Sequence, residues 1–169
     1  MPCHNIVYHG TNKPKQFSNP IIHRRTKLID GNMKSIFNEK SFHASPIRWI
    51  ALAYTYTPKT FLIDGKEVFY NIEIDLYENT QEIIIHGIES LEKSLSELYG
   101  DGGYILEFGS EHFHHKIGLG CLEVISKEIL LPDKIIFIVN PVIELKKEHV
   151  NFKFTDLSKD KNQKYRNYK

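Results

Sequence analysis

The 169-residue chain has few cysteines and almost no net charge. Cys3 and Cys121 make neither a disulfide framework nor a Cys-x-x-Cys metal pair, so a reducing compartment is expected. The formal net charge of +1 argues against a chain-wide electrostatic grip on nucleic acid or on a membrane. A disulfide scaffold and a uniformly basic nucleic-acid-binding protein are therefore both disfavoured.

Long apolar runs are also lacking. No run approaches the 18 or so residues of a transmembrane helix. The first ten residues, MPCHNIVYHG, lack the basic and apolar regions of a secretory signal. We therefore expect a cytoplasmic protein, or one secreted into a host cell without a classical signal peptide.

The residue pattern that is present predicts an α+β domain over residues 1–143. Strands are expected in 5–11, 41–45, 68–77, 81–87, 102–109, 121–130 and 134–140, and helices after Pro46 and over 88–100. Many short strands with few helices favour mostly antiparallel sheets. Residues 12–40, punctuated by prolines and Gly31, are interpreted mainly as connection, with at most one short helix.

The chain changes character at residue 144. From there to residue 169 it holds eight Lys or Arg residues against four acidic ones, and few large apolar side chains. This composition predicts a basic, mobile C-terminal tail. The remaining body is then net negative, which disfavours contact with phosphate backbones.

Three short motifs in order carry a family resemblance. Residues 8–11 read YHGT at the end of the first expected strand, and FHASPIRWIALAYTY follows at 42–56. His43 and Tyr54 are eleven residues apart, and Glu123 lies in the late segment LEVIS. This set resembles the diphtheria-toxin and poly(ADP-ribose)-polymerase branch of the ADP-ribosyltransferases, over roughly residues 5–138. At position 43 the chain has histidine where that branch usually has tyrosine.

The resemblance implies a fold of split, mostly antiparallel sheets with flanking helices. It implies an NAD-dependent mono-ADP-ribosyltransferase, a glycosyltransferase that acts as a toxin or effector and uses NAD as co-substrate. The residues that it places in catalysis are Glu123, His9 and Tyr54. Those that it places around NAD are His9, Gly10, Thr11, His43, Ser45 and Tyr54.

The chemistry of NAD cleavage explains why these residue types would suit the site. Breaking the nicotinamide–ribose bond builds positive charge on the ribose, which a carboxylate such as Glu123 would stabilise. Aromatic rings at Tyr54 and His43 would form two walls for nicotinamide. The backbone of Gly10 would approach the carboxamide of nicotinamide, and His9 would bind a ribose hydroxyl. Thr11 and Ser45 would be supporting polar groups.

The resemblance also implies that the loop 109–120 contacts the acceptor. The net-negative body makes an acceptor protein the first choice, nucleic acid the second and water the third. Transfer of a single ADP-ribose rather than chain building is expected, because the chain is small. The protein itself is expected to be a monomer. No contact with a membrane is expected.

Other interpretations of the same residues remain open. His23, Arg24, Arg25 and His43 would suit an RNA 2′-phosphotransferase, which also consumes NAD. A catalytically inactive binding module on the same fold is another possibility. Tyr54 could be a core residue, and Glu123 could face outward on an alternating strand.

A metal site is the remaining alternative. Glu111, His112, His114 and His115 suggest zinc, but their spacing matches none of the usual zinc patterns, so no metal is expected.

Overall fold

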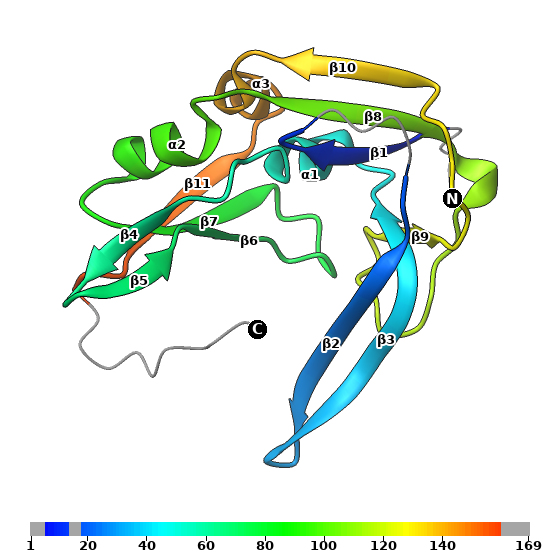
Figure 1. The fold of residues 1–169 in the computed structure, drawn as a ribbon, viewed down its shortest axis with the longest axis horizontal. Helices are drawn as coiled ribbons and strands as arrows, with labels where there is room; N and C mark the ends of the chain where they lie inside the picture. Colours follow the sequence, from blue (N-terminus) through cyan, green and yellow to red (C-terminus); the bar gives the residue numbers. More distant parts are fainter. Residues whose placement is uncertain (1–5, 14–17, 160–169) are drawn as a thin grey trace.

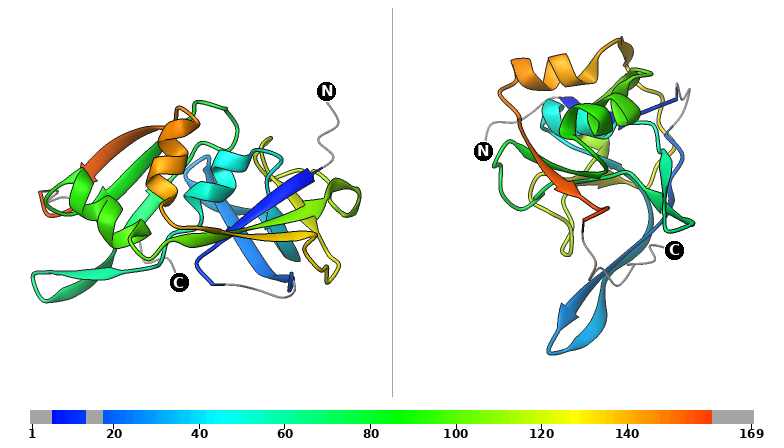
Figure 2. Two further views of the ribbon diagram at one scale, coloured as in Figure 1. Left: turned by 90° about the horizontal axis from the view of Figure 1, so that it is seen from above. Right: turned by 90° about the vertical axis from the view of Figure 1, so that its left-hand side faces the viewer.

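A computed structural model of the chain describes residues 6–13 and 18–159. These residues form a mixed α+β fold with three α-helices and several small sheets (Figures 1 and 2). Its elements, in chain order, are β1 (Ile6–Thr11), β2 (Ile21–Ile29), β3 (Asn32–Ala44), α1 (Arg48–Ala53), β4 (Thr60–Ile63), β5 (Lys66–Phe69), β6 (Asn71–Glu73), β7 (Glu82–Gly87), α2 (Leu91–Tyr99), β8 (Gly103–Gly109), η1 (Ser110–His112), β9 (Val124–Ser126), β10 (Lys134–Ile138), α3 (Pro141–Lys147) and β11 (Asn151–Asp156). The α+β class predicted from the sequence is confirmed.

Two antiparallel sheets meet near the middle of β1. One has the strand order β1-β8-β10 and the other has the order β2-β3-β9. Tyr8 of β1 and Ser45, just after β3, exchange both backbone hydrogen bonds, with N···O distances of 2.8 and 2.9 Å. Residues of the YHGT and FHAS motifs are thereby brought together from separate sheets.

A long hairpin, β2–β3, projects away from the rest of the molecule (Figure 1). The expectation that residues 12–40 are mainly connection is wrong over 21–40. Apolar and β-branched residues flank Asp30 and Gly31, whose φ angles of 51° and 76° make a tight turn of the type that joins twisted strands. The strand expected at 41–45 is the last part of β3.

Helix α1 follows Pro46, as predicted, and covers β1. Ala51, Leu52 and Ala53 are at most 2% exposed. A Cβ added to Gly10 would lie 1.7 Å from the carbonyl oxygen of Ala51, so only glycine permits this close approach of strand and helix. The YHGT strand is therefore fixed against α1 as well as against β8.

Helix α2 and strand β7 lie close to their predicted positions. Ser90 caps α2 by accepting a hydrogen bond from the backbone N–H of Lys93, and Gly100 follows its last turn. The single strand expected over 68–77 is instead divided between β5 and β6. None of the helices in the described part of the chain is long and apolar enough to cross a membrane.

The mobile tail expected from residue 144 is contradicted as far as residue 159. Asn140 caps α3, and β11 pairs in parallel with β7. Leu145 is fully buried and Val150 is 4% exposed, because the few apolar residues of this segment fall where helix and strand face the core. The tail interpretation can apply only to residues 160–169, which lie outside the described residues.

Candidate functional site

A pocket of about 450 Å³ opens where β1, the end of β3, α1 and the segment before β9 meet. It is within the size range of small-molecule sites. Every residue that the sequence analysis placed in catalysis or around NAD lines it: His9, Gly10, Thr11, His43, Ser45, Tyr54 and Glu123. The structure therefore brings the three motifs to one place.

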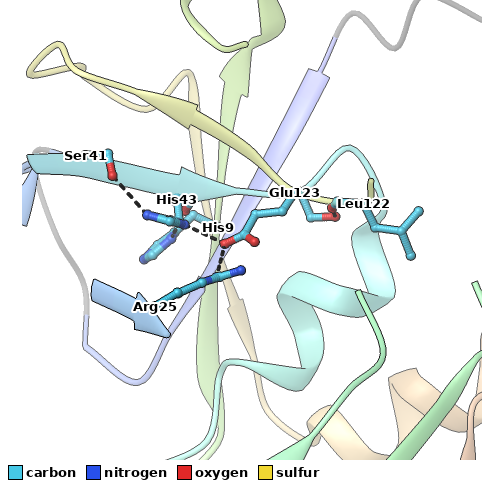
Figure 3. Close-up of polar contacts among 7 residues, drawn as sticks. His9, Arg25, Ser41, His43, Leu122 and Glu123 are labelled. Atoms are coloured by element: carbon cyan, nitrogen blue, oxygen red, sulfur yellow. Dashed lines mark hydrogen bonds and ion pairs between the residues drawn. The ribbon is translucent and has the colours of Figure 1, made fainter. Parts of the chain in front are cut away.

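Glu123 lies at the centre of the polar contacts in this pocket (Figure 3). Its Oε1 accepts a hydrogen bond from Arg25 at 2.6 Å and another from Nδ1 of His43 at 2.5 Å. The residue is 6% exposed, so it does not face outward into solvent. Burial raises its pKa, but the hydrogen bonds from His43 and Arg25 outweigh burial and lower it overall. Glu123 is therefore an ionised, buried carboxylate.

The second oxygen of this carboxylate has no protein partner. Oε2 of Glu123 is buried and makes no hydrogen bond with any residue that the structure describes. An unsatisfied buried carboxylate oxygen is costly, and such groups occur where a ligand or a reacting atom completes the site. Arg25 and His43 both bind Oε1, so Oε2 is the carboxylate oxygen that a water, an ion or a ligand in the pocket can reach.

His43 supports Glu123 in addition to lining the pocket. A carboxylate can only accept, so Nδ1 of His43 donates the hydrogen bond, and Nε2 lies 3.0 Å from Oγ of Ser41. The ring of His23 lies 3.9 Å from that of His43, measured between centroids. Burial, and next the electrostatic influence of His43 and Arg25, lower the pKa of His23 to about 4. His23 is therefore uncharged at neutral pH.

Tyr54 follows directly after α1 and points into the pocket rather than into the core. Its side chain is 40% exposed, although the residues before it on the helix are buried. Burial, and then the charge of Glu123, raise the pKa of its phenol to about 12. The ring is therefore a neutral aromatic surface beside the carboxylate.

His9 and Gly10 contribute the edge of β1. Nδ1 of His9 donates to the carbonyl oxygen of His43 at 2.8 Å, and its ring packs on Phe42 at 4.4 Å between centroids. Tyr8 uses its N–H and C=O to pair with Ser45. Because backbone groups alternate sides along a strand, the N–H and C=O of Gly10 face the same side as those of Tyr8, toward the pocket.

Thr11 and Ser45 line the pocket, but their hydroxyls bind neighbouring backbone. Oγ1 of Thr11 donates to the carbonyl of Lys13 at 3.1 Å. Oγ of Ser45 donates to the carbonyl of Leu122 at 2.7 Å and accepts from the N–H of Ile47 at 3.0 Å. Because Leu122 precedes Glu123, Ser45 positions the backbone that carries the carboxylate.

The loop 109–120 is partly anchored in the core. The ring of Phe113 packs against Phe42 and Phe108, with centroid distances of 6.3 and 5.7 Å. His114 pairs with Ile125 through two backbone hydrogen bonds of 3.0 Å. Among the residues that the structure describes, no three His, Cys, Asp or Glu side chains are grouped to hold a metal ion.

Arg25 and His23 are the residues whose part in this site the sequence analysis did not foresee. They were named only as possible phosphate ligands of an RNA 2′-phosphotransferase. Residues 12–40 were expected to be mainly connection, so no strand was expected to carry these side chains to the pocket.

Comparison of the chain with models of protein families, with curated proteins and with solved structures found no match.

Proposed function

We propose that the protein is an NAD-dependent mono-ADP-ribosyltransferase that transfers ADP-ribose to a macromolecular acceptor. One observation carries the proposal: a buried, ionised Glu123 with a free oxygen lies in the same pocket as His9, Gly10 and Tyr54. The resemblance in the sequence names the same four residues. The sequence motifs and the arrangement of the pocket therefore support the proposal independently.

The reaction breaks the bond between C1′ of a ribose and the ring nitrogen of nicotinamide. The bonding electron pair leaves with nicotinamide, and positive charge develops on the ribose. Glu123 stabilises that charge through its free oxygen, since a buried negative group acts strongly on nearby charge. The acceptor then forms a bond to C1′ and loses a proton, which the ionised carboxylate can accept.

The residues present fit NAD as substrate. The backbone N–H and C=O of Gly10 face the pocket edge and suit the two halves of a carboxamide. The ring of Tyr54 offers a flat apolar face for nicotinamide. His9 provides an imidazole for a ribose hydroxyl. Arg25, His43 and Ser45 act through Glu123, which they hold in place, so they are positioning residues.

The test is the Glu123→Gln variant, assayed by release of nicotinamide from NAD. Loss of the negative charge should lower the rate about 100- to 1,000-fold, the usual cost of removing one preorganised electrostatic group. Glu97→Gln is a matched control, because Glu97 is exposed on α2. Thermal denaturation of both variants checks that each is folded. A folded Glu123→Gln protein that releases nicotinamide at the wild-type rate would refute the proposal.

An RNA 2′-phosphotransferase is a second candidate, because the structure places His23 and Arg25 in the pocket with His43. The guanidinium of Arg25, however, is engaged by Glu123 at 2.6 Å, so binding a phosphate would require breaking that ion pair. Removal of phosphate from an oligonucleotide with an internal 2′-phosphate, dependent on NAD, would favour this function. Transfer without phosphate loss favours the first.

A further inference from the structure

The projecting hairpin β2–β3 concentrates positive charge. Residues 21–44 hold five Lys or Arg and two acidic residues, in a chain whose net charge is only +1. One of those acids, Glu39, already makes ion pairs with Lys116 and Lys127 from another part of the chain. Four exposed cations of the hairpin have no acidic partner among the described residues: Arg24, Lys27, Lys34 and Lys40.

Lys27 lies on β2 beyond the residues of that strand that line the pocket. Those residues, His23 and Arg25, are alternate residues and share one face of the strand. His23 is uncharged at neutral pH and Arg25 is paired with Glu123. Lys27 follows Arg25 toward the tip, across a shift in the register of the hairpin between Arg25 and Thr26. Lys34 lies directly opposite Lys27 in the register of the hairpin. Lys27 and Lys34 therefore place positive charge on the projecting arm, farther toward its tip than the residues that line the pocket.

The pair Lys27 and Lys34 is unfavourable in the protein alone. Like charges directly opposite one another on two strands destabilise the pairing. Neither lysine has an acidic partner in the described part of the chain to offset this repulsion. A ligand with repeated negative charges would offset it. Residues on one face of a strand recur about every 6.7 Å, close to the spacing of successive phosphates in an extended nucleic-acid strand.

We propose that the β2–β3 hairpin binds the phosphate backbone of a single-stranded nucleic acid and directs it to the pocket. As a statement about the acceptor, this inference rests on the proposed function. The net-negative body of the chain favoured a protein acceptor, but the charge of that body is unevenly spread, because the hairpin within it is net positive. A nucleotide enters a pocket of about 450 Å³ only when it is out of the base stack, which favours a single strand over a duplex.

The binding test needs no NAD, so its outcome is independent of the proposed reaction. Fluorescence anisotropy measures the Kd of labelled oligothymidylate and oligouridylate over a series of salt concentrations. The variant carries Lys27→Ala and Lys34→Ala. The matched control carries Lys134→Ala and Lys146→Ala, two exposed cations that make no ion pair with any described residue. They are on β10 and α3, which lie on the far side of the molecule from the hairpin tip (Figure 1).

Wild type and control should bind both oligonucleotides with affinity that falls as salt rises. The hairpin variant should bind more weakly, and the slope of log affinity against log salt should decrease in magnitude by about 1.4, or about 0.7 for each lost phosphate contact. Thermal denaturation should show that both variants are folded. Equal losses in the two variants would overturn the proposal. Tighter binding to polyglutamate or to phosphatidylserine vesicles than to oligonucleotide would also overturn it, by indicating an acidic protein or a membrane.

Discussion

Arg25→Met removes one of the two groups that hold Glu123. The side chain of Arg25 is 32% exposed and that of Glu123 is 8% exposed, so the 2.6 Å ion pair is only partly shielded from solvent. A hydrogen bond to a charged group contributes about 1.5–3 kcal/mol, and partial exposure argues for the lower end. We expect the free energy of unfolding at pH 7 to fall by about 1.5 kcal/mol.

The same change should raise the pKa of Glu123, because it removes one of the two groups whose hydrogen bonds and charge lower that pKa. In the wild type this pKa is below its ordinary value of 4.5. Stability from the pair is therefore present above the unfolded pKa and is lost as the pH falls through the folded one. The difference in stability between wild type and variant should thus shrink as the carboxylate becomes protonated.

Urea denaturation at pH 7 and at a series of lower pH values measures this difference directly. Arg24→Met is the matched control, because Arg24 is exposed, lies on the opposite face of β2 and has no ion pair among the described residues. Its stability should stay within about 0.5 kcal/mol of wild type. Two outcomes would refute the reasoning: equal stability of the two variants at pH 7, or a loss in Arg25→Met that is independent of pH.

Two further predictions concern acid sensitivity and the C-terminal segment. The pKa of His23 is lowered from 6.5 to about 4 in the folded protein, so between these pH values the unfolded chain binds a proton that the folded protein does not. The free energy of unfolding should therefore fall as the pH is lowered from 6.5 to 4, by at most about 3 kcal/mol. His23→Gln should flatten this part of the urea-denaturation profile, and an unchanged profile would contradict the shifted pKa. Leu145→Ala should lower the free energy of unfolding by about 2–5 kcal/mol, because Leu145 is fully buried. Lys146→Ala, at an exposed neighbouring position, should have almost no effect, and equal effects would support the tail interpretation.

Local patterns predicted the elements whose residues share a simple periodicity. The apolar alternation near residues 81–87 and the helical spacing after Ser90 correspond to β7 and α2. The seven predicted site residues also share one pocket, because their motifs are tied to strand ends that the sheets bring together. What they do there remains a prediction.

The parts that were missed depend on distant partners or on a turn that was overlooked. Arg25 contacts Glu123 across 98 residues of sequence, and no local pattern can indicate such a pair. Strand β11 is stabilised by parallel pairing with β7, which composition alone does not reveal. The hairpin, by contrast, had a local signal. Asp30 and Gly31 between two β-prone segments are a strong indication of a two-residue turn.

The distance in sequence between Arg25 and Glu123 has a consequence for synthesis on the ribosome. At about 5–20 residues per second, the hairpin emerges some 5–20 seconds before the carboxylate that its arginine binds. Strand β1 is likewise synthesised well before β8, its antiparallel neighbour. During that interval the edge of β1 is open to chaperones or to pairing with other chains. The pocket is complete only late in translation, so a nascent chain cannot carry out the proposed chemistry.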